Sequence, residues 1–134
     1  MTDRDERGSV TVFIVGVLLA LVVMGGLAFD GGAVIAGHRE ADAEAEGAAR
    51  AAAEQVSIAA LRSGHVQLNA AGATKAADTY LRHYGHTGSV IVNGNEVTVT
   101  VSYVVDMQVL DLIGIRSKAV TGTGTATAIE GAVP

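Results

Sequence analysis

The chain of 134 residues has no cysteine, no tryptophan and a single proline, and only 4% of its residues are aromatic. Without cysteine it has no disulfide, no thiolate metal site and no thiol nucleophile. Its nine lysines and arginines are scattered and outnumbered by fourteen acids, which gives a formal charge of −5. Because a duplex binder needs a clustered basic face, we expect no nucleic-acid partner. Hydrophobic residues make up 49% of the chain, which suits one domain of ordinary size rather than a disordered chain.

The apolar residues gather near the N-terminus. Residues 9–29 contain no charged side chain, and Asp30 is the first charge after them. A helix of about 20 residues rises about 30 Å, which matches the hydrocarbon core of a bilayer. We therefore predict a transmembrane helix over residues 9–29. A secretory signal cleaved at Ala28 is the alternative, although such signals usually have a shorter apolar core and a basic start.

The basic residues beside this segment predict its orientation. Arg4 and Arg7 precede it, whereas the nearest base after it is Arg39. Because Lys and Arg near a span favour the cytoplasmic side, we expect residues 1–8 in the cytoplasm and residues 30–134 as an extracytoplasmic domain. The lipid bilayer is then the first partner of a single-pass protein. Asp30 is interpreted as a charge at the membrane exit, the alternative being a functional acid within the lipid.

Small residues at helical spacing predict helix packing on both sides of Asp30. Within and just after the span they let helix backbones approach closely, although the glycines of the junction are also consistent with a hinge. The downstream stripe predicts an alanine-rich helix that extends the span, ends at Gly64 and docks on neighbouring helices. The acids Glu40, Asp42, Glu44 and Glu46 are expected on its solvated face. The predicted packing residues are Gly16, Ala20, Ala28, Gly32, Ala36, Ala41, Ala45, Ala48, Ala52, Val56 and Ala59.

The second half of the chain predicts a short helix followed by a sheet. Asn69 and Gly85 are suitable residues for the start and the stop of the helix. Strands over 89–92 and 96–103 flank an Asn-Gly turn, and threonine at every second position predicts a third strand over 118–129. Between them, residues 110–115 form either a helical turn or a loop plug. The predicted class is α+β, with a small antiparallel three-stranded sheet covered on one face by the helices.

No set of residues has the spacing of a catalytic or metal site. His83 and His86 lie three apart but lack a third ligand, so they are interpreted as surface histidines. No G-x-S-x-G motif is present, and Thr127 stands where a dinucleotide loop starting at Gly122 needs its third glycine. We therefore expect no enzyme, no cofactor, no metal and no small-molecule substrate.

Both ends of the chain resemble a known family. The start combines Arg7-Gly8, the exit over 27–32 and the alanine-rich run over 48–53; the far end adds the strand 97–103, the segment 110–115 and the threonine-rich strand. In these features the chain resembles the TadE/TadG-like proteins of Flp (tight adherence) pilus assembly. The resemblance implies a pilin-like fold and a role as a minor pilin-like or pilus-assembly protein, in the cell membrane or in a surface pilus. Other pilin-like or assembly membrane proteins would be its partners.

The same resemblance bears on processing. Pilin-like precursors are often cut after a glycine by a prepilin peptidase, and Gly8 stands at that place. The fifth residue after it is Phe13, where such precursors carry glutamate. The alternative function is that of a single-pass accessory or binding protein of the cell envelope with no filament role.

Overall fold

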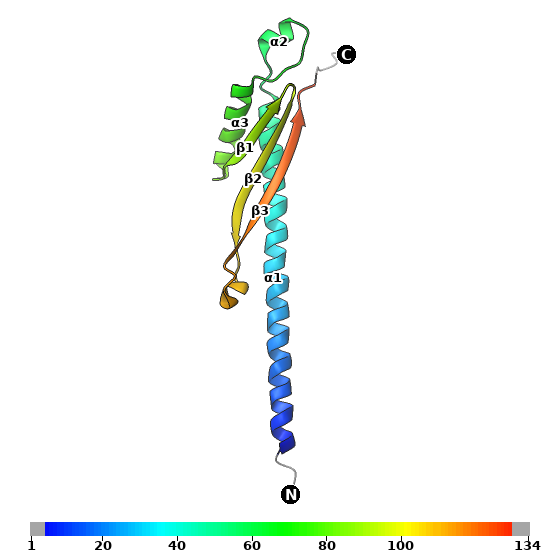
Figure 1. Ribbon diagram of the computed structural model, residues 1–134, viewed down its shortest axis with the longest axis vertical. Coiled ribbons are helices and arrows are strands. Elements are labelled where there is room, and N and C mark those ends of the chain that lie inside the picture. Colours follow the sequence, from blue (N-terminus) through cyan, green and yellow to red (C-terminus); the bar gives the residue numbers. More distant parts are fainter. Residues whose placement is uncertain (1–4, 130–134) are drawn as a thin grey trace.

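One long helix runs through most of the molecule (Figure 1). The computed structural model describes residues 5–129, with the side chains described from residue 8. Helix α1 spans Asp5–Ala53, and its 49 residues give a length of about 73 Å. Of the predicted cytoplasmic segment 1–8, residues 1–4 lie outside the described residues, as do residues 130–134 at the other end.

The glycines near Asp30 do not form a hinge. Helix α1 continues without a break through Gly25, Gly26, Gly31 and Gly32. Each glycine weakens a helix by about 1 kcal/mol relative to alanine, but tertiary packing of a helix face outweighs such propensities. From Gly26 onward α1 lies against the rest of the chain, beginning with the side chain of Val109. Of the two interpretations of the junction, the structure adopts the continuous helix.

The predicted end of this helix at Gly64 is wrong, because α1 already ends at Ala53. Beyond Ala53 the backbone pairs with a segment further along the chain. Ser57 N–H donates to the backbone carbonyl of Gln67 at 2.7 Å, and Asn69 N–H donates to the backbone carbonyl of Gln55 at 2.7 Å. These bonds replace the intrahelical ones. A separate five-residue helix, α2, then covers Ile58–Arg62.

The remaining elements confirm the predicted α+β class. Helix α3 spans Ala70–His83 and is capped by the Asn69 carboxamide oxygen, which accepts from Gly72 N–H at 3.2 Å. An antiparallel sheet of order β1-β2-β3 follows, with a short 3-10 helix, η1, between its last two strands. The bounds are β1 Gly88–Asn93, β2 Glu96–Asp106, η1 Leu110–Ile113 and β3 Ser117–Thr127.

The core lies between one face of the sheet and the helices α1 and α3. Val97, Val99 and Val101 of β2 are fully buried there, and the alternating threonines of β3 lie on the opposite, exposed face. Opposite β3, the closest approach of α1 is made through small residues such as Gly37, Ala41 and Ala45, and two glycines of the strand meet it. A Cβ on Gly122 would overlap the backbone of Ala41, so helix and strand are as close as glycine allows.

Candidate functional site: the junction of the apolar segment and the sheet domain

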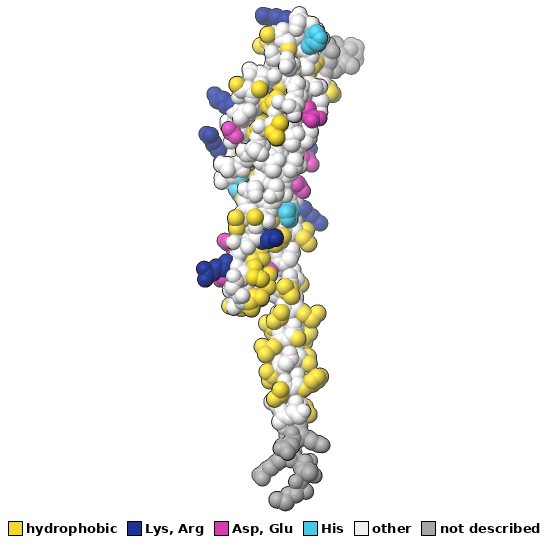
Figure 2. Space-filling view, in the orientation of Figure 1, with side chains coloured by type: hydrophobic (Ala, Val, Ile, Leu, Met, Phe, Trp, Pro, Cys, Tyr) yellow, Lys and Arg dark blue, Asp and Glu magenta, His cyan; other side chains and the backbone are white. Residues whose placement is uncertain are grey.

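The first half of α1 carries an uncovered apolar surface. Large hydrophobic side chains from Val10 to Phe29 are exposed around the helix, as the lower part of Figure 2 shows. By length and composition α1 is able to cross a membrane, and it is the one helix in the described part of the chain that meets this test. In water such a surface would be costly, at about 25 cal/mol per Å² of apolar area. An apolar solvent or partner is therefore required around residues 9–29.

Asp30 ends this apolar segment and fastens it to the sheet domain. Its side chain is completely buried, although it is the first charge after the uncharged segment. One carboxylate oxygen accepts from Gln108 N–H at 3.0 Å, and the other accepts from Val109 N–H at 3.0 Å and Leu110 N–H at 2.7 Å. These N–H groups lie at the start of η1, where a short helix leaves its first donors unpaired. Asp30 is thus a cap supplied by α1 to a loop 78 to 80 residues away.

The electrostatics of this contact favour a charged carboxylate. Burial alone would raise the pKa of Asp30, but the backbone N–H groups of Leu110, Gln108 and Val109 hold that pKa below its ordinary value. Hydrogen bonds to an ionised acceptor are also the stronger kind. The interpretation of Asp30 as an interface residue at the exit is therefore incomplete, because its charge is used inside the protein.

An apolar cavity of about 290 Å³ adjoins Asp30. One wall is α1, with Leu27 and Val34, and the other is the chain between β2 and β3, with Met107, Leu110 and Ile115. Lys118 also lines the cavity. Of the two forms predicted for residues 110–115, the structure adopts the helical turn, η1, and the loop around it lies against α1 through Val109 and Gly26.

The alanines of the downstream stripe form part of the chain's own core. Ala41, Ala45, Ala48 and Ala52 are fully buried against the sheet and α3, so they are not open to a neighbouring helix. The predicted docking of these four residues on partner helices is therefore corrected. The sequence could not distinguish the two partners, since a narrow alanine face suits a close strand as well as a close helix. A charge placed at Ala48 would disrupt the core rather than report on a partner.

Two further members of the stripe lie outside α1. Val56 is partly buried and pairs with Leu68 in an isolated β-bridge, and Ala59 is exposed on α2. They leave the stripe because α1 ends at Ala53.

The packing residues predicted within and just after residues 9–29 remain uncovered. Gly16, Ala20, Ala28, Gly32 and Ala36 are all exposed, and a Cβ built on either glycine would meet nothing within 4 Å. The predicted helix contact through these residues stays a prediction. Outside this set, Gly8 and Phe13 are also exposed on α1.

A buried polar cluster joins α1 to β2 and to the segment after α3. Glu44, predicted on a solvated face, is only 4% exposed and accepts from His86 Nδ1 at 2.7 Å. The His86 ring stacks on Tyr103 with centroids 4.2 Å apart, and Tyr103 donates its hydroxyl to the Gly37 carbonyl at 2.9 Å. Burial first, and then the charges of Glu40 and Glu44, raise the pKa of Tyr103, which keeps its hydroxyl a donor.

Sequence reasoning missed this cluster because its members lie 42 and 66 residues apart. One pattern in the sequence could have indicated that Glu44 is buried. Glu44 lies three residues after Ala41 and four residues before Ala48, so it shares their face of α1. His83, by contrast, meets the edge of Tyr84, so the two histidines of the predicted surface pair have different partners. Within the described residues no three His, Asp or Glu side chains are grouped to hold a metal ion.

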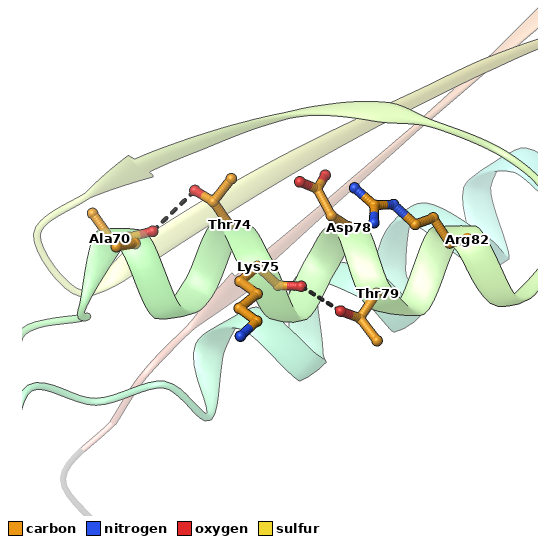
Figure 3. Close-up of a pocket in the computed structure, with 7 residues that line it drawn as sticks. Ala70, Thr74, Lys75, Asp78, Thr79 and Arg82 are labelled. Carbon is orange, nitrogen blue, oxygen red and sulfur yellow. Dashed lines mark hydrogen bonds between the residues drawn. The ribbon is translucent and has the colours of Figure 1, made fainter.

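An open hollow lies along the outer face of α3 (Figure 3). Lys75, Asp78 and Arg82 line it, and the hydroxyls beside them are engaged by the helix itself: Thr74 donates to Ala70 at 2.9 Å and Thr79 donates to Lys75 at 2.8 Å. Both hydroxyl protons are used in these bonds, so neither threonine is set up as a nucleophile.

Comparison with known proteins gives a match to a family model. A search of curated proteins and a search of solved structures found no match. Residues 8–55 match the family model described as "Putative Flp pilus-assembly TadE/G-like". This range covers the exposed apolar segment, Asp30 and the buried alanines, and it ends two residues after α1. The resemblance drawn from the sequence is thereby confirmed over residues 8–55, which are similar to this family.

Proposed function

We propose that the chain is a non-catalytic, membrane-anchored, pilin-like protein that acts in assembly of a Flp/Tad-type pilus or is a minor component of it. Residues 9–29 cross the membrane once, residues 1–8 are cytoplasmic and residues 30–134 form the extracytoplasmic domain. Other pilin-like or assembly proteins of the same membrane are its partners.

The observation that carries this proposal is the division of α1 into two halves. The large hydrophobic side chains from Val10 to Phe29 are exposed, whereas Ala41, Ala45 and Ala48 are buried in the sheet domain. The same uninterrupted helix therefore supplies both a surface that needs lipid and the spine of a folded domain. Asp30 marks the border between the halves and ties them together.

In this function the residues hold and position rather than react. The anchor keeps the domain at the membrane, and the exposed small residues Gly16, Ala20, Ala28, Gly32 and Ala36 offer a face on which another membrane helix packs. The Asp30 contact keeps the sheet at a fixed height above the anchor. No step of bond making or breaking is needed.

The anchoring is tested with single cysteines, because the chain has none of its own. Thr2→Cys and Asn95→Cys are treated in intact cells with a membrane-impermeant maleimide and again after lysis. We expect Asn95→Cys to be labelled in intact cells and Thr2→Cys only after lysis. The reverse pattern would overturn the orientation, and full-length protein in the supernatant after ultracentrifugation without detergent would overturn the anchoring.

The role in the pilus is tested separately. We expect deletion of the gene in its native cell to reduce piliation, and the wild-type gene to restore it. The protein should also co-purify from detergent extracts with other pilus-assembly membrane proteins. Normal piliation together with an anchored protein would instead support the envelope accessory role.

A further inference from the structure

The loop between β2 and β3 exposes a group of large apolar side chains. Leu112 is 85% exposed, Ile113 is 69% exposed and Ile115 is half exposed. They protrude from a loop that is held by backbone hydrogen bonds. Met107 N–H donates to the backbone carbonyl of Arg116 at 2.8 Å, and Ile115 N–H donates to that of Leu110 at 3.0 Å. Gly114 turns the chain at a φ of 92°. We call residues 107–116 the apolar loop. Contiguous exposed apolar groups of this kind mark a surface that contacts a partner or a membrane.

The position of the apolar loop identifies its partner. Val109 lies against Gly26, which is inside the uncharged segment 9–29, and the loop backbone is bonded to Asp30 directly after that segment. Gly26 precedes Asp30 by four residues, which is about 6 Å along a helix. Wherever residues 9–29 lie in lipid, the apolar loop therefore lies at the level where the hydrocarbon begins. Figure 2 shows the hydrophobic side chains of the helix continuing onto this end of the domain.

The charges beside the loop fit a lipid surface. Within residues 107–115 the one acid is Asp111, and it is 3.5 Å from Arg116. Lys118 adds a further positive charge and is one of the residues that line the apolar cavity. A long basic side chain beside apolar surface keeps its stem on that surface and its charge among headgroups. Asp106 precedes the loop, and the bases Arg116 and Lys118 stand at its other end. Apolar residues inserted about 5–10 Å into the boundary of headgroups and acyl chains, with bases beside them, are typical of interfacial binding.

We propose that the apolar loop is a second membrane contact, with Leu112, Ile113 and Ile115 inserted at the boundary between phospholipid headgroups and acyl chains. This inference rests on the proposed anchoring through residues 9–29. With two contacts, the domain does not stand free on a single helix: the loop fixes which side of the sheet domain faces the bilayer.

The test uses full-length single-cysteine variants that carry an environment-sensitive fluorophore in proteoliposomes with anionic lipid. Ile113→Cys probes the loop, and Leu18→Cys probes the span. Ile91→Cys is the matched control, an isoleucine of the sheet with a similar exposure of 57%. Circular dichroism of each labelled protein checks folding. Each label is then exposed to a water-soluble quencher, iodide, or to a lipid with a nitroxide, placed near the headgroup for residues 113 and 91 and at the end of the acyl chain for residue 18.

We expect labels at residues 113 and 18 to emit at shorter wavelength and to be quenched by the nitroxide lipid, and the label at residue 91 to be quenched by iodide. If iodide quenches residue 113 while lipid quenches residue 18, the loop contact is overturned and the anchoring stands. A residue 113 label shielded from both quenchers indicates contact between copies and also overturns the proposal. If iodide quenches residue 18, the anchoring itself has failed.

Discussion

Replacing Gly122 by alanine tests how closely α1 and β3 pack. The added Cβ would overlap main-chain atoms of Ala41 and Asp42. Main-chain atoms cannot move aside by changing rotamer, so the helix would have to separate from the strand. Overpacking costs about 1–3 kcal/mol, and we place G122A at the upper end of that range. The lower entropy of alanine in the unfolded chain offsets about 0.4–1 kcal/mol, which leaves a net loss of about 2 kcal/mol.

Urea unfolding of the full-length protein in detergent micelles, followed by far-ultraviolet circular dichroism, measures this loss. For an m-value of about 2 kcal/mol per molar, the midpoint should fall by about 1 M. G124A should behave in the same way, because its Cβ overlaps the backbone of Ala45 and Glu46. Thr123→Ala, between the two glycines on the exposed face, is the matched control and should stay within about 0.5 kcal/mol of the wild type.

Two outcomes would refute this reasoning. The first is a G122A midpoint equal to that of the wild type and of T123A. The second is rescue of G122A by Ala41→Gly, because truncating a side chain cannot relieve an overlap with backbone. Either result would mean that β3 does not lie against α1 in the way described.

Three further predictions follow from Asp30, Tyr103 and Gly8. Asp30→Asn places amide donors against backbone donors, so hydrogen exchange of the amides at 108–110 should accelerate, whereas Asp78→Asn on the outer face of α3 should leave it unchanged. Because the pKa of Tyr103 is raised above 10.0, the stability it contributes is complete below pH 10 and is lost as pH rises through the raised value; urea midpoints between pH 8 and 11 should fall more for the wild type than for Tyr103→Phe. With Phe13 in place of glutamate, intact mass of the membrane-extracted protein should show residues 1–8 retained, and a mass lacking them would contradict this.

Local patterns were sufficient to predict most of the fold. The alternation of Val97, Val99 and Val101 with threonine predicted a strand with one buried face, and the structure confirms it because that face packs on the helices. The start at Asn69 was also predictable, since the cap bond to Gly72 is made within four residues of sequence. In both cases the determining interaction is local or depends only on which face is buried.

Contacts between distant segments account for what was missed. The end of α1 at Ala53 depends on backbone bonds between residues near 56 and residues near 68, and nothing in the helix-forming sequence before Gly64 reveals them. The same is true of Asp30, whose three donors lie about 80 residues away. A charge next to a membrane segment has an obvious local explanation, and only tertiary structure shows that it caps a loop.

The continuity of α1 has a consequence for how copies of this protein face one another. Each residue of a helix turns the chain by about 100° about its axis. The threonine-covered face of the sheet therefore points in a fixed direction around the axis of α1. That direction is set by the number of residues between Gly26 and Ala41. Inserting one residue there would swing the sheet by more than a right angle and pull Val109 away from Gly26. Every copy of the chain thus holds its sheet at the same angle around the first half of α1.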